Sequence, residues 1–296
     1  MSVGIIDVGT NTVRLLITDG RGLGERDMVI TRLGQGVDAS RVLAPAAMER
    51  TIDAIAERAE RCRARAIDDV RIIATSAVRD AANRDEFLAR VAAATGITPD
   101  VLSGEQEATL SFRGATLETP EDGPFLVCDI GGGSTELIVG ADAIERAVSL
   151  DIGSVRLTER HLRADPVDEA ERARARADAE RAIDATGSWP RAGVLIGVAG
   201  TVTTLAALVL GLETYDMRAV HHASLTRAQV AEWASRLAAM TNQERRALAV
   251  MPPGREEVIV AGVTIFEVVM DRFGFERALV SETDILDGAA AELLAR

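Results

Sequence analysis

The sequence contains no lysine, and all 33 of its basic side chains are arginines. A Walker-type phosphate loop requires a lysine, so nucleotide-binding proteins of that class are excluded. The 46 acidic side chains give a net charge of −13, which opposes non-specific binding to nucleic acid and to anionic membrane surfaces. We therefore expect no nucleic acid and no membrane among its partners. A polyanion can still bind where arginines gather, because the planar guanidinium pairs with two phosphate oxygens at once.

Cysteine is scarce as well. Cys62 and Cys128 are the two cysteines, one on a predicted helix and one on a predicted buried strand, without CxxC spacing. They indicate buried thiols in a reducing compartment. No basic leader precedes the first strand and every apolar run is too short to span a bilayer, so we expect a cytoplasmic protein. The three histidines have no metal-ligand spacing with other ligands, so a histidine-centred metal site is not expected.

The composition is that of a globular protein, with 47% hydrophobic and 27% charged residues. Each half opens with a strand meander and continues with alternating strands and helices, which predicts an α/β fold. The polar, acidic segment 118–124 predicts a boundary between domains at 1–120 and 121–296, with the terminal helix able to pack back on the first. The expected strands are residues 3–7, 12–18, 27–33, 70–75, 97–102, 125–130, 136–140, 143–150, 194–198 and 277–280. The expected helices are residues 45–65, a helix capped by Ser76 that carries Phe87 and Val91 inward, 105–117, 166–186, 255–273 and 283–294.

Two stretches of the sequence, residues 5–17 and 127–139, align without a gap. Their matched turn positions are Asp7 with Asp129, Gly9 with Gly131, and Thr12 with Ser134. Each stretch reads as strand, tight turn and strand, and such a repeat indicates two related domains that each offer a phosphate-binding hairpin. Ordinary hairpin turns are the alternative for either stretch alone, since Asp and Gly are common there.

The second stretch carries the stronger signal, because Gly131, Gly132 and Gly133 are followed by Ser134. Glycines allow unusual φ angles and close approach to a ligand, and their bare N–H groups form an anion site. Asp129 and Glu136 flank the turn and would repel phosphate. A bridging metal removes that conflict, and Mg²⁺ is the hard, oxygen-binding candidate.

Other segments supply further candidates. Gly200 and Thr201 lie at a predicted helix N-terminus, where free N–H groups bind phosphate, although close helix–sheet packing explains small residues equally well. Glu105 and Glu107 begin a helix after a strand and are candidates for activating water, although acids in a first turn also stabilise the helix dipole. Arg79 is predicted near a helix start, where a cation is disfavoured unless it faces an anion. Four more arginines can line a phosphate track, and spacing does not select among Arg14, Arg113, Arg156 and Arg255.

Five motifs, in order along nearly the whole chain, resemble those of the exopolyphosphatase and guanosine pentaphosphate phosphatase (Ppx/GppA) family in its short two-domain form. They are the segments 7–11 (DVGTN), 74–80 (ATSAVRD), 103–108 (SGEQEA), 129–136 (DIGGGSTE) and 197–201 (GVAGT). This family belongs to the actin, Hsp70 and sugar kinase superfamily. The resemblance implies two actin-like (ribonuclease H-like) domains with a phosphate-binding cleft between them, and hydrolysis of a terminal phosphoanhydride with Mg²⁺, or with Mn²⁺ as the alternative ion.

The resemblance also implies residue roles. Glu107 would be the general base, with Glu105 at a variable position, and Asp129, Glu136 and Asp7 would hold or orient the metal. The implied phosphate contacts are Thr10, Asn11, Arg79, Gly131, Gly132, Gly133, Ser134, Gly200 and Thr201. Segment 281–288 is a variant of the family's usual ending.

The substrate implied is inorganic polyphosphate, with short chains preferred because the helical C-terminal domains of longer members are lacking. A dimer built on those domains is not expected, although a homodimer of another kind stays open. Guanosine pentaphosphate is the alternative substrate. A polyphosphate- or nucleotide-binding sensor without turnover is an alternative of another class, and an ATP-dependent kinase shares the superfamily fold.

Overall fold

The computed structural model describes residues 2–296, which form two compact units. Unit 1 comprises the chain as far as Gly114 together with Thr283–Arg296, and unit 2 is Ala115–Glu282. The sequence predicts the division at residue 120, in the polar segment 118–124. The observed division lies a few residues earlier, after Gly114. Unit 2 is thus inserted between two segments that together make unit 1.

Unit 1 is a five-stranded sheet with the strand order β3-β2-β1-β4-β5. The first three strands are an antiparallel meander, and β4 and β5 continue the sheet in parallel with β1. Its strands are β1 (Val3–Val8), β2 (Thr12–Thr18), β3 (Glu25–Ile30), β4 (Val70–Ala74) and β5 (Asp100–Val101). Its helices are α1 (Val37–Ser40), α2 (Pro45–Ala64), α3 (Ser76–Asp80), α4 (Arg84–Thr95), α5 (Gly104–Thr116) and α13 (Ile285–Leu294).

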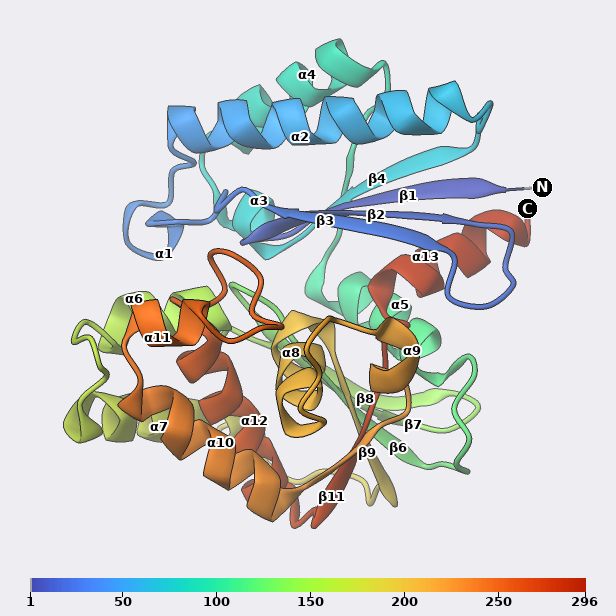
Figure 1. The fold of residues 1–296 in the computed structure, drawn as a ribbon. Helices are drawn as coiled ribbons and strands as arrows, with labels where there is room; N and C mark the ends of the chain where they lie inside the picture. Colours follow the sequence, from blue (N-terminus) through green and yellow to red (C-terminus); the bar gives the residue numbers. More distant parts are fainter. Residues whose placement is uncertain (1) are drawn as a thin grey trace. The chain divides into compact units, whose positions relative to one another are not determined.

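Alternating side chains of β1 supply the two cores of this unit, as a strand buried on both faces requires. Ile6 and Val8 pack with residues of α2 and α4, whereas Val3 and Ile5 pack with residues of α5 and α13. Figure 1 shows α2 and α4 above the sheet and α13 along its other face. The last helix of the chain therefore completes the core of the first unit.

Unit 2 repeats this order in a six-stranded sheet, β10-β11-β9-β6-β7-β8. Again an antiparallel meander, β6-β7-β8, is continued by two strands, β9 and β11, that run parallel to its first member, and β10 adds an antiparallel edge strand. Its strands are β6 (Phe125–Ile130), β7 (Thr135–Gly140), β8 (Ile144–Leu150), β9 (Val194–Val198), β10 (Ser224–Thr226) and β11 (Arg277–Val280). Its helices are α6 (Ser154–His161), α7 (Glu169–Asp184), α8 (Ala199–Val209), α9 (Met217–Val220), α10 (Arg227–Ala239), α11 (Asn242–Arg246) and α12 (Ile259–Phe273).

The shared strand order is that of the ribonuclease H-like fold, so the predicted α/β class with two such units is confirmed. In unit 2 the apolar helices α8 and α12 form the largest core with Leu126, Cys128 and Ile130 of β6. Among residues 2–296, no helix combines the length and hydropathy that crossing a membrane would need.

Two predicted helices are wrong in their extent. The helix expected to begin at Ser76 is two helices, the single-turn α3 and the separate α4, and Thr75 rather than Ser76 is the N-cap residue. The helix expected to begin at Arg255 begins at Ile259, so Arg255 lies in the turn before α12. Both errors arise because periodicity detects an apolar face and does not locate where the backbone turns away from it.

Candidate active site

Two buried carboxylates face one another across the first hairpin of unit 2. Asp129 on β6 is directly opposite Glu136 on β7, and their exposed fractions are 7% and 1%. Side chains opposite each other share one face of the sheet, where like charges are destabilising. Ser149 of β8 donates a hydrogen bond to Glu136 Oε1 at 2.7 Å. A cation beside this pair relieves the repulsion, and two carboxylate groups are donors that Mg²⁺ prefers.

The turn between these strands is held closely by the segment that follows the hairpin. The N–H of Gly131 donates to Ser134 O at 3.0 Å, and the N–H groups of Ser154 and Val155 donate to Gly131 O and Gly132 O, both at 2.9 Å. The buried Arg156 donates from Nε to Gly133 O at 2.6 Å. The carbonyl groups of the turn therefore accept hydrogen bonds from the start of α6, and these bonds hold the turn in place.

The glycine-rich turn has no positive φ angle, and it packs closely against Gly153. None of Gly131, Gly132 and Gly133 has a positive φ, so the expectation of unusual φ angles is wrong. Gly153, the residue before α6, lies close against this turn, since a Cβ there would lie 2.4 Å from Gly132 O and 2.7 Å from Gly133 C. The turn and the start of α6 therefore fit together only because residue 153 has no side chain.

The first hairpin of unit 1 has the same construction. Gly9 N donates to Thr12 O at 2.9 Å, the counterpart of the bond from Gly131 to Ser134, and Asp7 is opposite Arg14 in the register that pairs Asp129 with Glu136. An arginine thus replaces the second carboxylate. Arg14 donates to Asp7 Oδ2 from Nε at 2.9 Å and from NH2 at 2.8 Å, and it also pairs with Asp284.

Asp7, which the family motifs imply as a metal ligand, therefore lies beside a guanidinium group. Its Oδ1 is buried without a hydrogen-bond partner, so one oxygen can still accept a ligand. Burial raises the pKa of Asp7, and Arg14 opposes that shift. Within residues 2–296, no three His, Cys, Asp or Glu side chains form a metal-binding group. A metal here would depend on oxygens from the substrate, as Mg²⁺ commonly does.

Thr10 and Asn11 lie in the turn of unit 1. Thr10 is buried, with its hydroxyl 2.9 Å from Ser76 Oγ, and its carbonyl accepts from Gly34 N at 2.8 Å. The carbonyl of Asn11 accepts from the N–H groups of Thr31 and Arg32, both at 3.0 Å. The turn expected to contact phosphate is thus fixed by the segments that follow β3 and β4.

Glu107 and Arg79, predicted separately, form an ion pair in unit 1. Arg79 NH1 donates to Glu107 Oε2 at 2.8 Å and to Leu102 O at 2.9 Å. Glu107 is 7% exposed, whereas Glu105 is exposed to solvent. Arg79 lies in the last turn of α3 and not at a helix start, so the dipole argument made for it from the sequence is wrong.

Gly200 and Thr201 do begin a helix, α8, and the structure adds Arg255 to them. A Cβ on Gly200 would lie 1.6 Å from Arg255 NH1, so the guanidinium lies directly against the first turn of α8. Arg255 NH1 also donates to Thr204 Oγ1 at 3.3 Å. Thr201 is buried against Gly262 of α12, which shows that helix packing explains part of this small-residue segment. A guanidinium beside the N–H groups of a helix N-terminus adds to the positive charge there, and both groups favour an anionic ligand.

The structure therefore separates the four arginines that spacing could not. Arg14 pairs with Asp7 and Asp284, Arg156 supports the glycine-rich turn, and Arg113 pairs with Glu292 on the surface of unit 1. Arg255 alone of these four lies at the start of α8 in unit 2. The Pro-Pro-Gly turn at 252–254 was the sequence feature that could have placed Arg255 outside the helix. The apolar pattern of the helix that follows obscured it.

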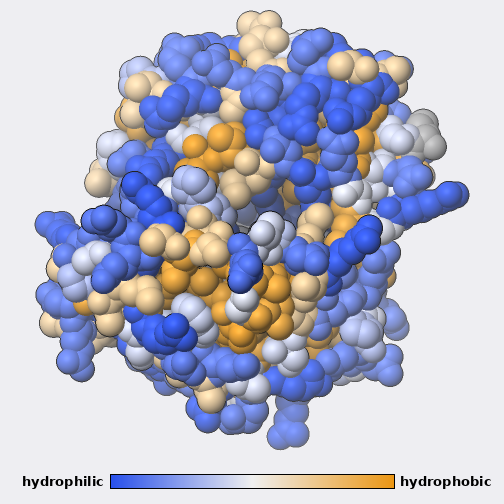
Figure 2. Space-filling model, in the orientation of Figure 1, coloured by the Kyte–Doolittle hydropathy of each residue, from blue (hydrophilic) through white to orange (hydrophobic). Residues whose placement is uncertain are grey.

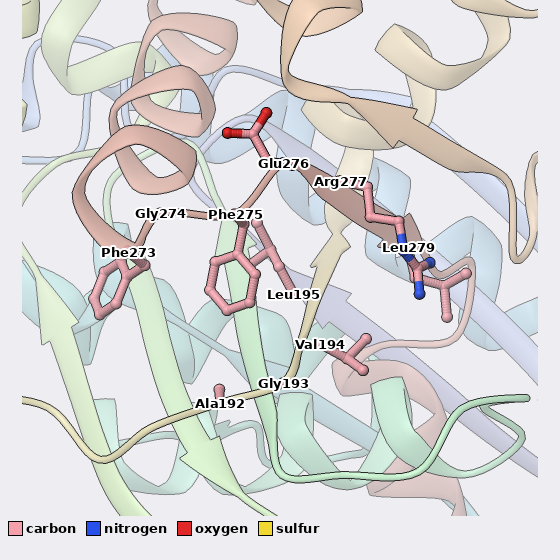
Figure 3. A pocket seen from close by; sticks show the side chains of 10 residues that line it. All are labelled: Ala192, Gly193, Val194, Leu195, Phe273, Gly274, Phe275, Glu276, Arg277 and Leu279. Carbon is pink, nitrogen blue, oxygen red and sulfur yellow. The ribbon is translucent and has the colours of Figure 1, made fainter.

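Two surface hollows of unit 2 lie away from these residues. One, of about 400 Å³, is lined by Val194, Phe275 and Arg277 among others, at the ends where β9 and β11 begin (Figure 3). The glycine-rich turn and α8 follow the opposite ends of the parallel strands. The other, of about 590 Å³, lies between α8 and α10 and includes Trp233, where Figure 2 shows apolar side chains. Neither contains a predicted site residue.

Comparison with known proteins decides which family this geometry represents. The Ppx/GppA phosphatase family model matches residues 23–296. The chain belongs to the Ppx/GppA phosphatase family. It is 44% identical to exopolyphosphatase 2 of Mycobacterium tuberculosis, an alignment that covers 98% of both chains. As a Ppx/GppA member it is a phosphoric anhydride hydrolase, as the sequence motifs predict.

Two further similarities concern the fold and the substrate. The crystal structure of an exopolyphosphatase-like protein superposes with a TM-score of 0.96 at 36% identity, covering 100% of this chain and 99% of that one. A guanosine-5′-triphosphate,3′-diphosphate pyrophosphatase of Vibrio atlanticus is 31% identical over 76% of this chain, which spans 46% of that relative.

Proposed function

We propose that this Ppx/GppA protein is an exopolyphosphatase that removes the terminal phosphate of inorganic polyphosphate and prefers short chains. The proposal rests on the repeated hairpin turn, which hydrogen bonds from neighbouring segments hold in place. In unit 2 this turn adjoins the buried Asp129–Glu136 pair. Such a carboxylate pair beside an anion-binding turn is suited to a metal–phosphate group. The 44% identity to a protein named exopolyphosphatase supports the choice of substrate.

The proposed roles fall on residues of both units. From unit 1, Glu107 orients the attacking water and accepts its proton, while Arg79, Thr10 and Asn11 contact phosphate oxygens. From unit 2, the N–H groups of Gly131, Gly132 and Gly133, the hydroxyl of Ser134, and the start of α8 at Gly200 and Thr201 bind the phosphate chain. Phosphoryl transfer requires mostly positioning and charge stabilisation from a protein, which these groups provide.

Arg255 joins this group on structural grounds, because its guanidinium lies at the first turn of α8. It contributes the positive charge that a phosphate chain requires in a protein of net charge −13.

Asp129 and Glu136 would hold Mg²⁺, with Mn²⁺ as the alternative ion, and Asp7 of unit 1 keeps the metal-binding role that the family motifs imply. The ion, when bound, neutralises charge on the phosphate oxygens and on the two carboxylates. The donor set fits this ion because it consists of buried oxygens and requires substrate oxygens to complete it.

The test is release of free phosphate from polyphosphates of defined length, with Mg²⁺, with Mn²⁺ and with a chelator. We expect release that depends on the metal, with the highest kcat/KM on short chains. Absence of phosphate release at every length would overturn the proposal. Tight binding without turnover would instead identify a sensor, and ADP formation from ATP with an acceptor would identify a kinase.

Guanosine pentaphosphate is the alternative substrate of the same chemistry, supported by the similarity to the Vibrio atlanticus pyrophosphatase. Competition between the two substrates decides between them. We expect a kcat/KM for polyphosphate above that for guanosine pentaphosphate, and the reverse order would favour the alternative.

A further inference from the structure

The turn before α12 places Arg255 against α8, and backbone hydrogen bonds join it to the start of that helix. Arg255 N donates to Pro252 O at 3.0 Å, and Arg255 O accepts from Val258 N at 3.0 Å and from Ile259 N at 2.9 Å. Gly254 has a φ of +91°, a conformation that other residues rarely adopt. A turn of this kind needs further contacts to present an arginine in one direction.

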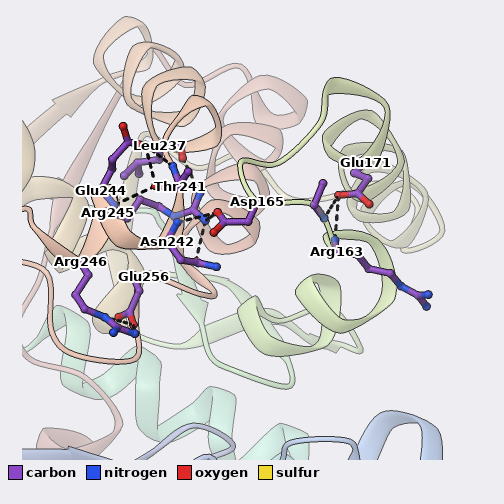
Figure 4. A network of polar contacts seen from close by, with 11 residues as sticks. Arg163, Asp165, Glu171, Leu237, Thr241, Asn242, Glu244, Arg245, Arg246 and Glu256 are labelled. Atoms are coloured by element: carbon purple, nitrogen blue, oxygen red, sulfur yellow. Dashed lines mark hydrogen bonds and ion pairs between the residues drawn. The ribbon is translucent and has the colours of Figure 1, made fainter.

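Glu256 provides those contacts from inside the protein. Its side chain is fully buried, and Oε2 accepts from Gly254 N at 2.5 Å while Oε1 accepts from Arg246 Nε at 2.9 Å and from Arg246 NH2. Figure 4 shows Arg246 reaching from α11 to this carboxylate. The Glu256 carboxylate thus joins the turn to α11.

Such an arrangement is not explained by stability alone. Burying a carboxylate is costly unless it is paired and hydrogen-bonded, and well-packed apolar side chains often stabilise as much as a buried ion pair does. Arg246 is exposed, so its contact with Glu256 is partly screened by water. The Arg246–Glu256 pair does fix the geometry of the residues next to Glu256 in the turn, and Arg255 is one of them.

We propose that Glu256 and Arg246 are positioning residues for phosphate binding. They fix the 252–258 turn so that the guanidinium of Arg255 lies over Gly200 at the start of α8. This inference rests on the proposed role of Arg255 in the exopolyphosphatase, since neither Glu256 nor Arg246 is expected to touch the substrate itself.

The neighbouring residue of α11 offers a matched control. Arg245 is buried and donates to Leu237 O at 2.7 Å, to Asn242 Oδ1 at 2.9 Å and to Asp165 Oδ1 at 3.5 Å, in a separate part of the network in Figure 4. None of these three contacts involves the 252–258 turn. Asp165→Asn therefore disturbs an arginine contact of the same helix without releasing Arg255.

The first experiment measures kcat and KM for polyphosphate in Glu256→Gln and Arg246→Gln. We expect KM to rise by about 5- to 20-fold in each, the scale for one charge-assisted contact, with kcat within about twofold of the parent. Asp165→Asn should leave KM unchanged. Because Arg246 lies at the surface, its variant keeps the test valid if Glu256→Gln folds poorly.

The second experiment is a double-mutant cycle with Arg255→Gln. If Glu256 acts through Arg255, the Arg255→Gln/Glu256→Gln double variant should have the KM of Arg255→Gln alone. The proposal would be overturned if the increases in KM of Arg255→Gln and Glu256→Gln were fully additive in the double variant. An unchanged KM in both of these single variants would also overturn it.

Direct binding separates this inference from the proposed function. Polyphosphate binding by Glu107→Gln, with and without Glu256→Gln, can be measured by calorimetry in the absence of turnover. A parent that releases no phosphate contradicts the proposed function, yet a weaker Kd in the Glu256→Gln background still supports positioning. An unchanged Kd contradicts the positioning role whatever the activity.

Discussion

At the residue scale, the structure distinguishes two glutamates that the sequence places two positions apart. Glu107 is buried and paired with Arg79, whereas Glu105 is exposed at the first turn of α5. Their different surroundings make them a natural pair of test and control, because both substitutions remove one negative charge from the same helix.

We expect Glu107→Gln to lower kcat by about 100-fold or more, the usual scale for loss of a general base. Glutamine keeps the size and hydrogen-bonding reach of glutamate but does not accept the proton, so substrate binding should persist. Glu105→Gln should retain nearly full activity. An active Glu107→Gln with an inactive Glu105→Gln would show that the motif alignment is displaced by two residues.

The carboxylates opposite each other in unit 2 make a second prediction at this scale. Asp129→Asn and Glu136→Gln should each raise the Mg²⁺ concentration needed for half-maximal rate, so that added metal partly restores activity. The reason is that each variant removes a charged oxygen donor for a hard cation. Metal titrations of the rate measure this, and a normal metal requirement in both variants would remove these residues from the metal site.

At the element scale, the glycine-rich turn of unit 2 packs against the loop that precedes α6. Gly153→Ala places a Cβ 2.4 Å from Gly132 O, and that atom belongs to the backbone and has no rotamer to change. We expect kcat/KM to fall about tenfold or more, since displacing a positioning element by a fraction of an ångström is costly to catalysis.

Gly193→Ala is the matched control for that substitution, because its Cβ would meet Pro124 O at 3.9 Å, an ordinary contact. Thermal unfolding of both variants should be compared with their rates. Equal rates in Gly153→Ala and the parent would show that the turn tolerates displacement.

The docking of α13 gives a prediction about pH. Burial, which outweighs the nearby Arg26, raises the pKa of Asp287 to about 6, and the charge of Asp284 adds to that shift. The folded state then holds a proton that the unfolded state has lost, so the free energy of unfolding falls as pH rises from about 4 to about 6. The full contribution of this group is at most about 3 kcal/mol.

Asp287→Asn should remove this part of the pH dependence. Denaturant unfolding of unit 1 at several pH values measures it, with the parent losing stability relative to the variant as pH rises. A constant difference between the two proteins from pH 4 to pH 7 would contradict a raised pKa.

At the scale of the whole molecule, unit 1 is built from the two ends of the chain. The apolar side chains of Ile285, Leu286, Ala289 and Ala290 complete the core that contains Val3 and Ile5. A chain that stops at residue 282 should therefore lose protection of β1 and β2, whereas the strands of unit 2 should stay protected. Hydrogen exchange measures both, and retained protection of β1 would contradict this view of the core.

The sequence by itself determined the repeat, the class of fold and the family. The strands at 3–8 and 125–130 and the turns after them follow from local alternation and glycine placement, which a single chain displays directly. The choice of Glu107 over Glu105 comes from the family motif and stays a prediction. These features depend on residues close together in the chain.

Only the tertiary structure decided which arginine lies at the start of α8, which residues support it and why residue 153 is a glycine. Arg255 and Gly200 are 55 positions apart in the sequence, and their contact depends on how β9, α8 and the turn before α12 pack together. Arg246 of α11 meets Glu256 of the 252–258 turn, and Gly153 meets the turn after Asp129, each through its own contact between segments. Contacts between distant segments leave no periodic pattern in a single sequence, because each depends on the fold that brings the segments together.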